Sequence, residues 1–488
     1  MDGSLYRCNS TQIQEMENFT SSPIEKMSDA HPVNPAQKRV RKSLSPPQKG
    51  GEDSQPEQPC FNVAKVPEPT HMRTFHDWHK TIQQHFPELV TAVEASLSVV
   101  TQLLIRDVTN CSALVLVDSP AAGKTIAINI FDEIEGITYS SDTFTPASFV
   151  SNAANVAKDK LAKLDLLPRI RRRMFLVRDM ATIFSARDDD LMKNMGILTR
   201  VLDGEGLSTD TGIHGRRALR GDYLFMMLAA STPIPPRVWK VMGTLGQRIF
   251  FLGLHLKRKT KEELVRQLKD TTYKQKELDC RSVTMDFLLT LWNQYPDGVT
   301  WNREDESDEL LGIIAQCSLL LARLRGQVFI YKEKWEGDDK ELGHTVPSVE
   351  HENRINQCLY NIARGHALAM GRKKLDPGDL RLIILLAFDS APGHRAPLFH
   401  ELIRKGGTIK TGDVEALLHC SNPTALKEMK TFTILGICEE VEGGTFDTSK
   451  NIRLKDDLSW FLSDECKRYL GKIHNNDTAS EKLSALPF

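Results

Sequence analysis

Residues 113–128 read ALVLVDSPAAGKTIAI, and they give the strongest indication of the fold of the chain. Its apolar beginning, Ala113–Val117, is typical of a buried strand, and a short loop then leads through Gly123, Lys124 and Thr125 into an apolar helical start. Backbone N–H groups at a helix N-terminus attract anions. The order of strand, loop and helix therefore predicts a phosphate-binding loop, in which Lys124 reaches the β- and γ-phosphates of ATP and Thr125 lies on Mg²⁺.

The loop departs from the pattern G-x-x-x-x-G-K-[ST] at its first position, where Asp118 replaces glycine. An aspartate there has less backbone freedom and adds negative charge near the phosphates. The alternative is a chance G-K-T at the start of a helix. On the first interpretation, the residues expected to contact the nucleotide are Asp118, Ser119, Pro120, Ala121, Ala122, Gly123, Lys124, Thr125 and Ile126.

Length and composition are those of an ordinary globular chain with two or three domains. The chain has 488 residues, 40% of them hydrophobic, and a formal net charge of −1, so any binding to nucleic acid must come from a local patch. Its nine cysteines form no C-x-x-C pair, which argues against a zinc site or a disulfide framework. We expect no membrane span and no signal-peptide core, and therefore a cytoplasmic location.

The pattern along the chain changes from polar, to alternating strands and helices, to helices alone. Residues 1–70 are rich in Ser, Pro and charge, which predicts disorder, and the basic cluster 38–42 within them is either an address signal, a nucleic-acid tether or a solvated tail. Further apolar runs predict strands at 174–177, 223–230 and 249–254, and hence a mostly parallel sheet with helices on both faces. Helices are expected at 76–108, 144–166, 191–202, 309–325, 353–370, 377–388, 397–405, 411–419 and 424–435.

An aspartate follows a predicted strand at the position where an ATPase needs a carboxylate to hold Mg²⁺. The strand 174–177 is followed by Arg178 and then Asp179, which we expect to hold Mg²⁺. If the apolar run fixes the register strictly, Asp179 takes the second, water-activating position and Arg178 the first. The usual acidic pair is missing, and the alternative is an aspartate in a turn at the end of a strand.

Together these motifs resemble the AAA+ ATPases, in particular those with a β-hairpin inserted before the third motif: the MCM-like helicases, the MoxR-like remodellers and proteins of phages and mobile elements. The segments that carry the resemblance are Leu202–Gly206, Ala230–Pro233 and Leu245–Phe250, and it covers about 75–460. It implies an α/β fold with a P-loop parallel sheet, a helical lid and a homo-oligomeric ring. The segments expected are a disordered tail (1–70), a nucleotide-binding core (71–258), a helical lid (259–390), a winged helix (391–465) and a flexible tail (466–488).

The resemblance also implies roles for three further residues. Thr232 stands where the family has a polar sensor of the γ-phosphate, and Arg248 resembles the arginine finger that reaches the nucleotide of the adjacent subunit; otherwise Arg248 is a surface ion pair. Arg354 falls at the second sensor arginine, which contacts the nucleotide from the lid, and Arg364 is its competitor.

Two segments of the sequence indicate that the protein binds DNA. The polar stretch 204–221 resembles the inserted hairpin, which touches the threaded substrate in the pore of the ring, and Arg216, Arg217 and Arg220 would suit phosphate contacts. Three helices and a hairpin after residue 394 predict a winged helix, whose third helix carries Lys427 and Lys430. The alternatives are a solvated surface hairpin and a protein-docking module.

The sequence thus predicts an ATP hydrolase that acts on DNA, helicase-like or translocating, with ATP and Mg²⁺ as its ligands and DNA as a stimulant of its turnover. A MoxR-like protein remodeller is the main alternative. A DNA-binding regulator that senses ATP and hydrolyses it poorly is the third, because of Asp118 and the missing acidic neighbour of Asp179.

Overall fold

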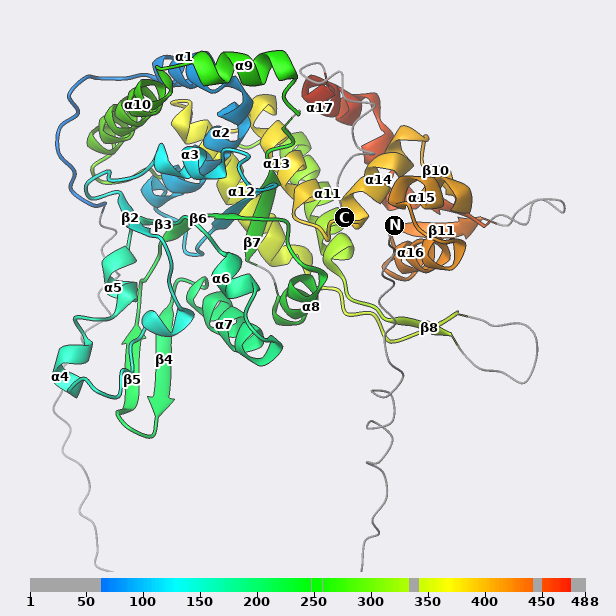
Figure 1. The fold of residues 1–488 in the computed structure, drawn as a ribbon, viewed down its shortest axis with the longest axis horizontal. Coiled ribbons are helices and arrows are strands. Elements are labelled where there is room, and N and C mark those ends of the chain that lie inside the picture. Colours follow the sequence, from blue (N-terminus) through cyan, green and yellow to red (C-terminus); the bar gives the residue numbers. More distant parts are fainter. Residues whose placement is uncertain (1–62, 247, 257, 333–341, 442–449, 475–488) are drawn as a thin grey trace, which may run out of the picture. The chain divides into compact units, whose positions relative to one another are not determined.

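Five parallel strands form the central sheet of the protein, in the order β2-β3-β6-β1-β7 (Figure 1). The computed structural model describes residues 63–474 with gaps at 247, 257, 333–341 and 442–449, so that most of the tail predicted for 1–70 lies outside the described residues. The strands are β1 (Ala113–Val117), β2 (Thr138–Ser141), β3 (Met174–Val177), β6 (Met226–Ser231) and β7 (Ile249–Gly253).

Strand β1 lies between β6 and β7, with Ala113 opposite Met227 on one side and Ile249 on the other. These strands are buried almost throughout, as expected for parallel strands covered by helices on both faces. The α/β class and the parallel sheet predicted from the sequence are confirmed. Strand β2 was not predicted, because its residues Thr-Tyr-Ser-Ser form no apolar run.

The helices follow the predicted pattern in its second half better than in its first. A single helix over 76–108 is wrong, because Pro87 begins a short 3₁₀ turn that separates α1 from α2. The helix over 144–166 is also wrong, because that segment holds only a short 3₁₀ helix at Pro146–Ser148, the short α4 and the first residue of α5 among its described helices. The helices that come before and within the sheet are α1 (Phe75–His85), α2 (Val90–Val100), α3 (Lys124–Asn129), α4 (Lys158–Leu161), α5 (Leu166–Ile170), α6 (Ala181–Phe184), α7 (Asp188–Val201) and α8 (Pro236–Leu245).

The segment after the sheet is mainly helical and packs directly on the core. Its elements are α9 (Lys261–Lys269), α10 (Tyr273–Gln294), α11 (Asp308–Arg325), the strands β8 (Ile330–Lys332) and β9 (Leu342–His344), α12 (Glu352–Ala369) and α13 (Pro377–Asp389). Helices α12 and α2 cross so closely that Gly365 leaves no room for a side chain. A Cβ atom on it would lie 2.0 Å from the carbonyl oxygen of Ser98, and the Thr101 hydroxyl donates to the Gly365 carbonyl over 2.7 Å.

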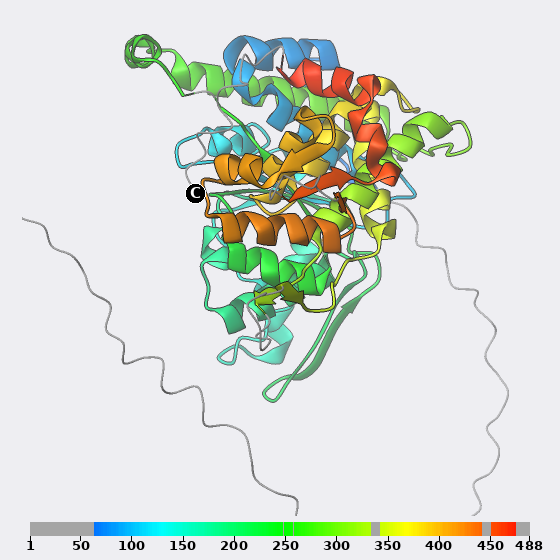
Figure 2. The same cartoon turned by 90° about the vertical axis from the view of Figure 1, so that its right-hand side faces the viewer.

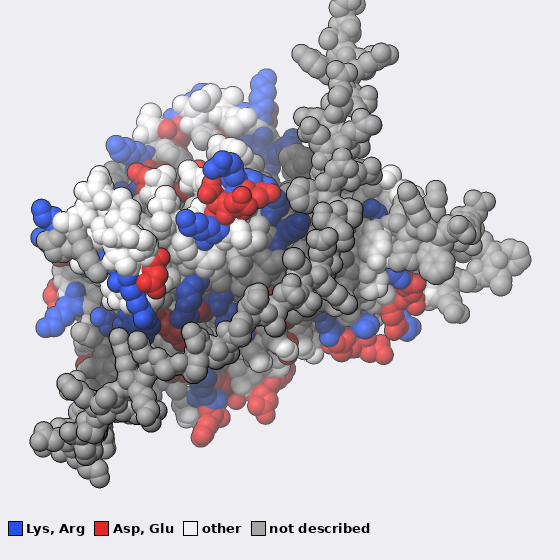
Figure 3. Space-filling model, turned by 90° about the horizontal axis from the view of Figure 1, so that it is seen from below, with Lys and Arg blue, Asp and Glu red and all other residues white. Residues whose placement is uncertain are grey.

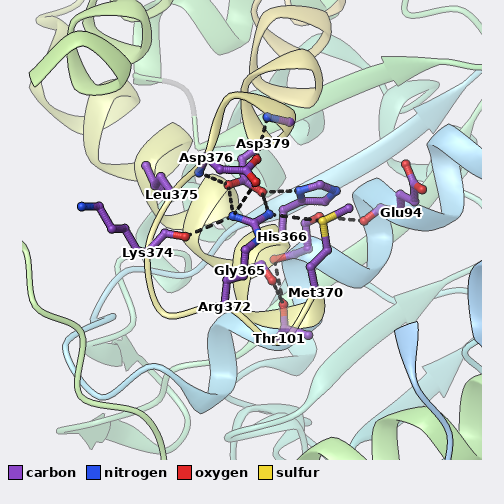
Figure 4. Close-up of polar contacts among 12 residues, drawn as sticks. Glu94, Thr101, Gly365, His366, Met370, Arg372, Lys374, Leu375, Asp376 and Asp379 are labelled. Carbon is purple, nitrogen blue, oxygen red and sulfur yellow. Dashed lines mark hydrogen bonds and ion pairs between the residues drawn. The ribbon is translucent and has the colours of Figure 1, made fainter. Parts of the chain in front are cut away.

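A buried polar cluster joins the end of α12 to the start of α13 (Figure 4). The Asp379 carboxylate is fully buried and accepts hydrogen bonds from both terminal nitrogens of Arg372, and its Oδ1 lies 2.6 Å from Nδ1 of His366. Asp376 caps the same helix through a capping box with Asp379. Burial raises the pKa of Asp379, but the hydrogen bonds from His366 and Arg372 outweigh it, so the pKa lies below the usual value.

An antiparallel hairpin leaves the core between α7 and β6. Its strands are β4 (Gly206–Thr211) and β5 (Gly215–Arg220), with Asp210 opposite Arg216. Figures 1 and 2 both show it projecting away from the sheet. The hairpin expected in 204–221 is therefore present.

Residues 395–454 form three helices and a small antiparallel sheet of order β10-β12-β11. The elements are α14 (Arg395–Arg404), β10 (Thr408–Lys410), α15 (Thr411–Leu418), α16 (Asn422–Ile434), β11 (Cys438–Val441) and β12 (Asn451–Leu454). The last described element is α17 (Asp464–His474), where Cys466 is fully buried, so the prediction of a flexible tail is wrong for 466–474, and its remainder lies outside the described residues.

Candidate functional site

The loop after β1 takes its shape from two residues with positive φ, Ala121 at 64° and Gly123 at 85°. Alternating left- and right-handed backbone turns the N–H groups of such a loop toward one side, where they form a concave site for an anion. Asp118, by contrast, has no positive φ, so the glycine of the usual pattern is not needed at this position. Its carboxylate accepts a hydrogen bond from the Ser119 N–H over 2.6 Å.

Lys124 is buried at the start of α3 and folds over the loop. Its Nζ donates to the carbonyl oxygens of Asp118 and Ser119, each over 2.6 Å. Burial lowers the pKa of the Lys124 ammonium, while the negative charges of Asp118 and Asp179 act in the opposite direction. The charge of Asp179 therefore acts on the Lys124 ammonium, although the two residues are far apart in the sequence.

The ends of the neighbouring strands meet at this carboxyl edge of the sheet. The Asp118 N–H donates to the carbonyl oxygen of Ser231, at the end of β6, and the Met180 N–H donates to that of Ala230. Asp179 follows β3 and uses one carboxylate oxygen to accept the Ala181 N–H over 2.8 Å. Thr232 follows β6 and is exposed. The sheet thus brings Lys124, Asp179 and Thr232 to one edge, where ligands bind in open α/β sheets.

Arg178 is held at the same edge by partners that were not predicted. Its guanidinium forms ion pairs with Asp132 and Asp142 and donates to the side-chain oxygen of Asn129 over 3.0 Å. The hydrogen bond with Asp142 is the largest of the effects that raise the pKa of Arg178. Asp142 directly follows β2, so the ion pair between Arg178 and Asp142 could have been predicted only if β2 itself had been predicted.

The donor set at this edge fits magnesium with a phosphate ligand. Mg²⁺ takes oxygen ligands and is usually held by one or two carboxylates together with substrate phosphates. The second carboxylate oxygen of Asp179 and the exposed hydroxyl of Thr125 are oxygens of that kind. Across the described ranges, no three His, Cys, Asp or Glu side chains are grouped so that they could hold a metal ion.

The two predicted arginines Arg248 and Arg354 lie at the opposite edge of the sheet. Arg248 comes just before Ile249, which pairs with Ala113 at the beginning of β1. Because Asp118 follows the other end of β1, about six residues of strand, roughly 20 Å, separate the two levels. The Arg248 side chain is only 9% exposed, and its Nε donates to Oδ1 of Asp203 over 2.6 Å. Arg354 lies 3.9 Å from the same oxygen and is 43% exposed.

Arg364, the competitor of Arg354, is not placed to meet a ligand. Its side chain is fully buried in an ion pair with Asp107 and lies over the ring of Tyr360, at 4.6 Å from the ring centroid. Burial is the largest influence on the pKa of Arg364 and lowers it, and the charge of Asp107 opposes the effect. Arg364 therefore ties α12 to the segment before β1.

The basic residues of the hairpin differ in how accessible they are. Arg216 and Arg220 are exposed. Arg217 instead turns back onto Asp165, which is buried, with 2.7 Å between Nη2 and Oδ2, and it also contacts the carbonyl oxygen of Ser151. The Arg217 guanidinium therefore anchors the hairpin, and the predicted contact with DNA would have to replace this ion pair.

The third helix of the C-terminal segment, α16, presents little free positive charge. Lys427 is partly exposed, whereas Lys430 is bound to Glu440 over 3.0 Å. Glu428 pairs with His394 on the side of α14. Among the side chains that are not grey, Figure 3 shows basic and acidic groups intermingled on the face seen from below. This pattern does not amount to a continuous basic patch on that visible part.

Comparison with models of protein families found no match, and comparison with curated proteins found no significant match either. Within the described ranges, every helix is too short or too polar to cross a membrane.

Proposed function

We propose that this protein is a Mg²⁺-dependent ATP hydrolase of the AAA+ type that works on DNA. The observation that carries the proposal is the position of Lys124. Its ammonium is buried over a loop with two left-handed residues and lies within electrostatic reach of Asp179, at the end of another strand of the same sheet. A cation with a carboxylate nearby is what a site for a magnesium-bound triphosphate requires.

Each residue at the carboxyl edge then has a role in binding or orientation. Lys124 exchanges its bonds to two loop carbonyls for bonds to the β- and γ-phosphates. Thr125 and Asp179 hold Mg²⁺, which neutralises charge on the phosphates when bound. Thr232, at the end of the strand next to β1, is positioned to donate its hydroxyl to the terminal phosphate.

The opposite edge supports an assembly in which one subunit completes the site of the next. Arg248 lies about 20 Å from its own phosphate loop along the strand direction, too far for a single side chain to span. A guanidinium at this edge therefore reaches a nucleotide only in a neighbouring copy, and a head-to-tail contact of that kind forms a ring when the rotation between copies closes. An arginine supplied in this way is worth ~10³–10⁵ in rate.

DNA is the proposed substrate because of the projecting hairpin and the C-terminal helices. Arg216 and Arg220 on the hairpin are exposed cations suited to backbone phosphates. Helices α14, α15 and α16 and the small sheet β10-β12-β11 have the order of elements that is typical of a winged helix. We assign the helices α10 to α13 to a lid.

The position of Arg178 favours a second candidate, a DNA-binding regulator that senses ATP. An efficient hydrolase places a second carboxylate beside the metal-binding aspartate to orient water, whereas the two neighbours of Asp179 are Arg178, which Asp132 and Asp142 hold, and the buried Met180. On this alternative the protein binds ATP and hydrolyses it only slowly.

The test is ATP turnover with and without single- and double-stranded DNA. The wild-type protein should hydrolyse ATP faster with DNA, and Lys124→Ala should abolish turnover because the phosphates lose their main cation. The exposed Lys80→Ala on α1 is the matched control and should be unchanged. Turnover without a response to DNA favours a protein remodeller instead, and binding with little turnover favours the regulator. A protein that retains no nucleotide contradicts all three.

A further inference from the structure

Asp203 is the point at which three arginines from different elements meet. Its Oδ1 accepts from Arg248, which precedes β7, and lies 3.9 Å from Arg354 of α12. Its Oδ2 accepts from Arg200 of α7 over 2.9 Å. One carboxylate therefore holds Arg248, which the proposed function assigns to a neighbouring nucleotide, and also lies close to Arg354 at the same edge of the sheet.

The same residue stands directly at the base of the β4–β5 hairpin. Gly204 follows it with φ of 79°, and a Cβ there would lie 2.5 Å from the carbonyl oxygen of Thr109, so the backbone is fixed against the core at this point. The base is closed by hydrogen bonds from the Tyr223 N–H to Gly204 and from the Gly221 N–H to Glu205. Because Asp203 is joined directly to this base through Gly204, a movement of the Asp203 backbone also moves the base of the hairpin.

We propose that Asp203 is a positioning residue that holds Arg248 and Arg354 until the terminal phosphate of a neighbouring subunit's nucleotide replaces it, and that this exchange links the nucleotide to the hairpin. The inference rests on the proposed function.

The exchange has a simple electrostatic basis. Asp203 offers one negative charge, shared among three guanidinium groups, whereas a terminal phosphate with its three oxygens offers more charge and forms bidentate pairs with arginine. The Asp203 side chain is 20% exposed, and Arg354 is more exposed than Arg248. An incoming anion therefore meets Arg354 first and Arg248 behind it. Asp203 is then left with Arg200, which also binds Glu205 at the hairpin base.

A matched aspartate on the other side of the hairpin provides a control. Asp222 follows β5 as Asp203 precedes β4, it is 23% exposed, and it pairs with two arginines, Arg171 and Arg172. Both of those arginines precede β3, at the same amino edge of the sheet, but the proposed function assigns neither of them to a nucleotide. The two aspartates therefore share exposure and chemistry and differ in what they hold.

The experiment compares ATP turnover with and without DNA in the wild type, Asp203→Asn and Asp222→Asn. The isosteric amide removes the charge that joins the arginines to the hairpin, so in Asp203→Asn the ratio of turnover with DNA to turnover without it should fall to about one, the value for uncoupled sites. Asp222→Asn should keep the stimulation of the wild type, and Asp203→Glu should restore it.

Hydrogen exchange of the wild-type protein gives a second readout that needs no variant. Addition of a non-hydrolysable ATP analogue to the assembled protein should change the exchange of the Gly221 and Tyr223 amides, which close the hairpin base.

The inference alone is overturned by wild-type stimulation in Asp203→Asn, or by unchanged exchange at the hairpin base of a protein that binds nucleotide. Loss of basal and stimulated turnover in equal proportion, with lowered thermal stability, identifies a purely structural residue and also overturns it. A wild-type protein that neither binds nor hydrolyses ATP overturns the proposed function, and the inference with it.

Discussion

At the scale of single residues, the candidate site depends on side chains whose charge is balanced within the fold. Lys124 bonds to two carbonyl oxygens of its own loop, and Arg178 bonds to two aspartates beside it. The same holds for the buried Asp379, which His366 and Arg372 surround. Removing one partner of such a group costs more than the pair contributes, because the other is left buried and unpaired.

Asp379→Asn should therefore lower the free energy of unfolding by about 3 kcal/mol at pH 7. The folded-state pKa of Asp379 is lower than its usual value, so the contribution of the carboxylate is present above that usual value and is lost as the pH falls through the folded one. Urea unfolding of both proteins at a series of pH values measures this, and the difference between them should shrink only below about pH 4. A variant as stable as the wild type at pH 7 would show that the cluster in Figure 4 does not hold α12 and α13 together.

At the scale of elements, the helices after the sheet are bound to it through close backbone contacts. The clearest is the crossing of α2 and α12, where Gly365 touches the backbone of Ser98. This packing means that the region predicted as a lid meets the core of the sheet through α12, on the side where α2 contacts β1 and β6.

Gly365→Ala should destabilise the protein by about 2 kcal/mol, because the added methyl group forces two helices apart and overpacking costs ~1–3 kcal/mol. Gly312→Ala on α11 is the control, since a Cβ there meets no atom within 4 Å. It should stabilise the protein by up to about 1 kcal/mol through helix propensity alone. Thermal unfolding compares the two; equal effects of the same sign would contradict the close crossing.

The hairpin makes a second prediction at this scale. Arg217→Ala should destabilise the protein by about 3 kcal/mol, since it leaves the Asp165 carboxylate buried without its cation. Arg216→Ala should change stability by less than about 0.5 kcal/mol, as is usual on a surface, but should weaken DNA binding and reduce its salt dependence. Thermal unfolding and fluorescence anisotropy with labelled DNA at several salt concentrations separate the two roles. If Arg216→Ala binds DNA as the wild type does at every salt concentration, the hairpin is not the DNA contact.

At the scale of the whole molecule, sequence patterns predicted what lies next to an apolar run and missed what depends on tertiary contact. Asp179 and Thr232 were predicted because each follows a buried strand, and parallel strands bring their carboxyl ends together. Strand β2 and the partners of Arg178 were not, because a polar strand at the edge of a sheet gives no periodic signal. The anchoring of Arg217 by Asp165, 52 residues away in the chain, likewise has no local signature.

The two edges of the central sheet carry different candidate residues. Lys124 and Asp179 lie at the carboxyl edge, and Arg248 with Arg354 at the amino edge. In the proposed ring each interface combines one edge of each kind, so that a nucleotide is contacted by two subunits. The central claim, however, concerns one subunit alone: that Lys124 binds a triphosphate.

Calorimetric titration of the protein with a non-hydrolysable ATP analogue and Mg²⁺ tests that claim most directly. The wild type and Lys80→Ala should bind alike, while Lys124→Ala should bind at least about tenfold more weakly, a loss of about 1.4 kcal/mol or more. Wild-type protein that binds no analogue, or Lys124→Ala that binds it as tightly as the wild type, would contradict the account.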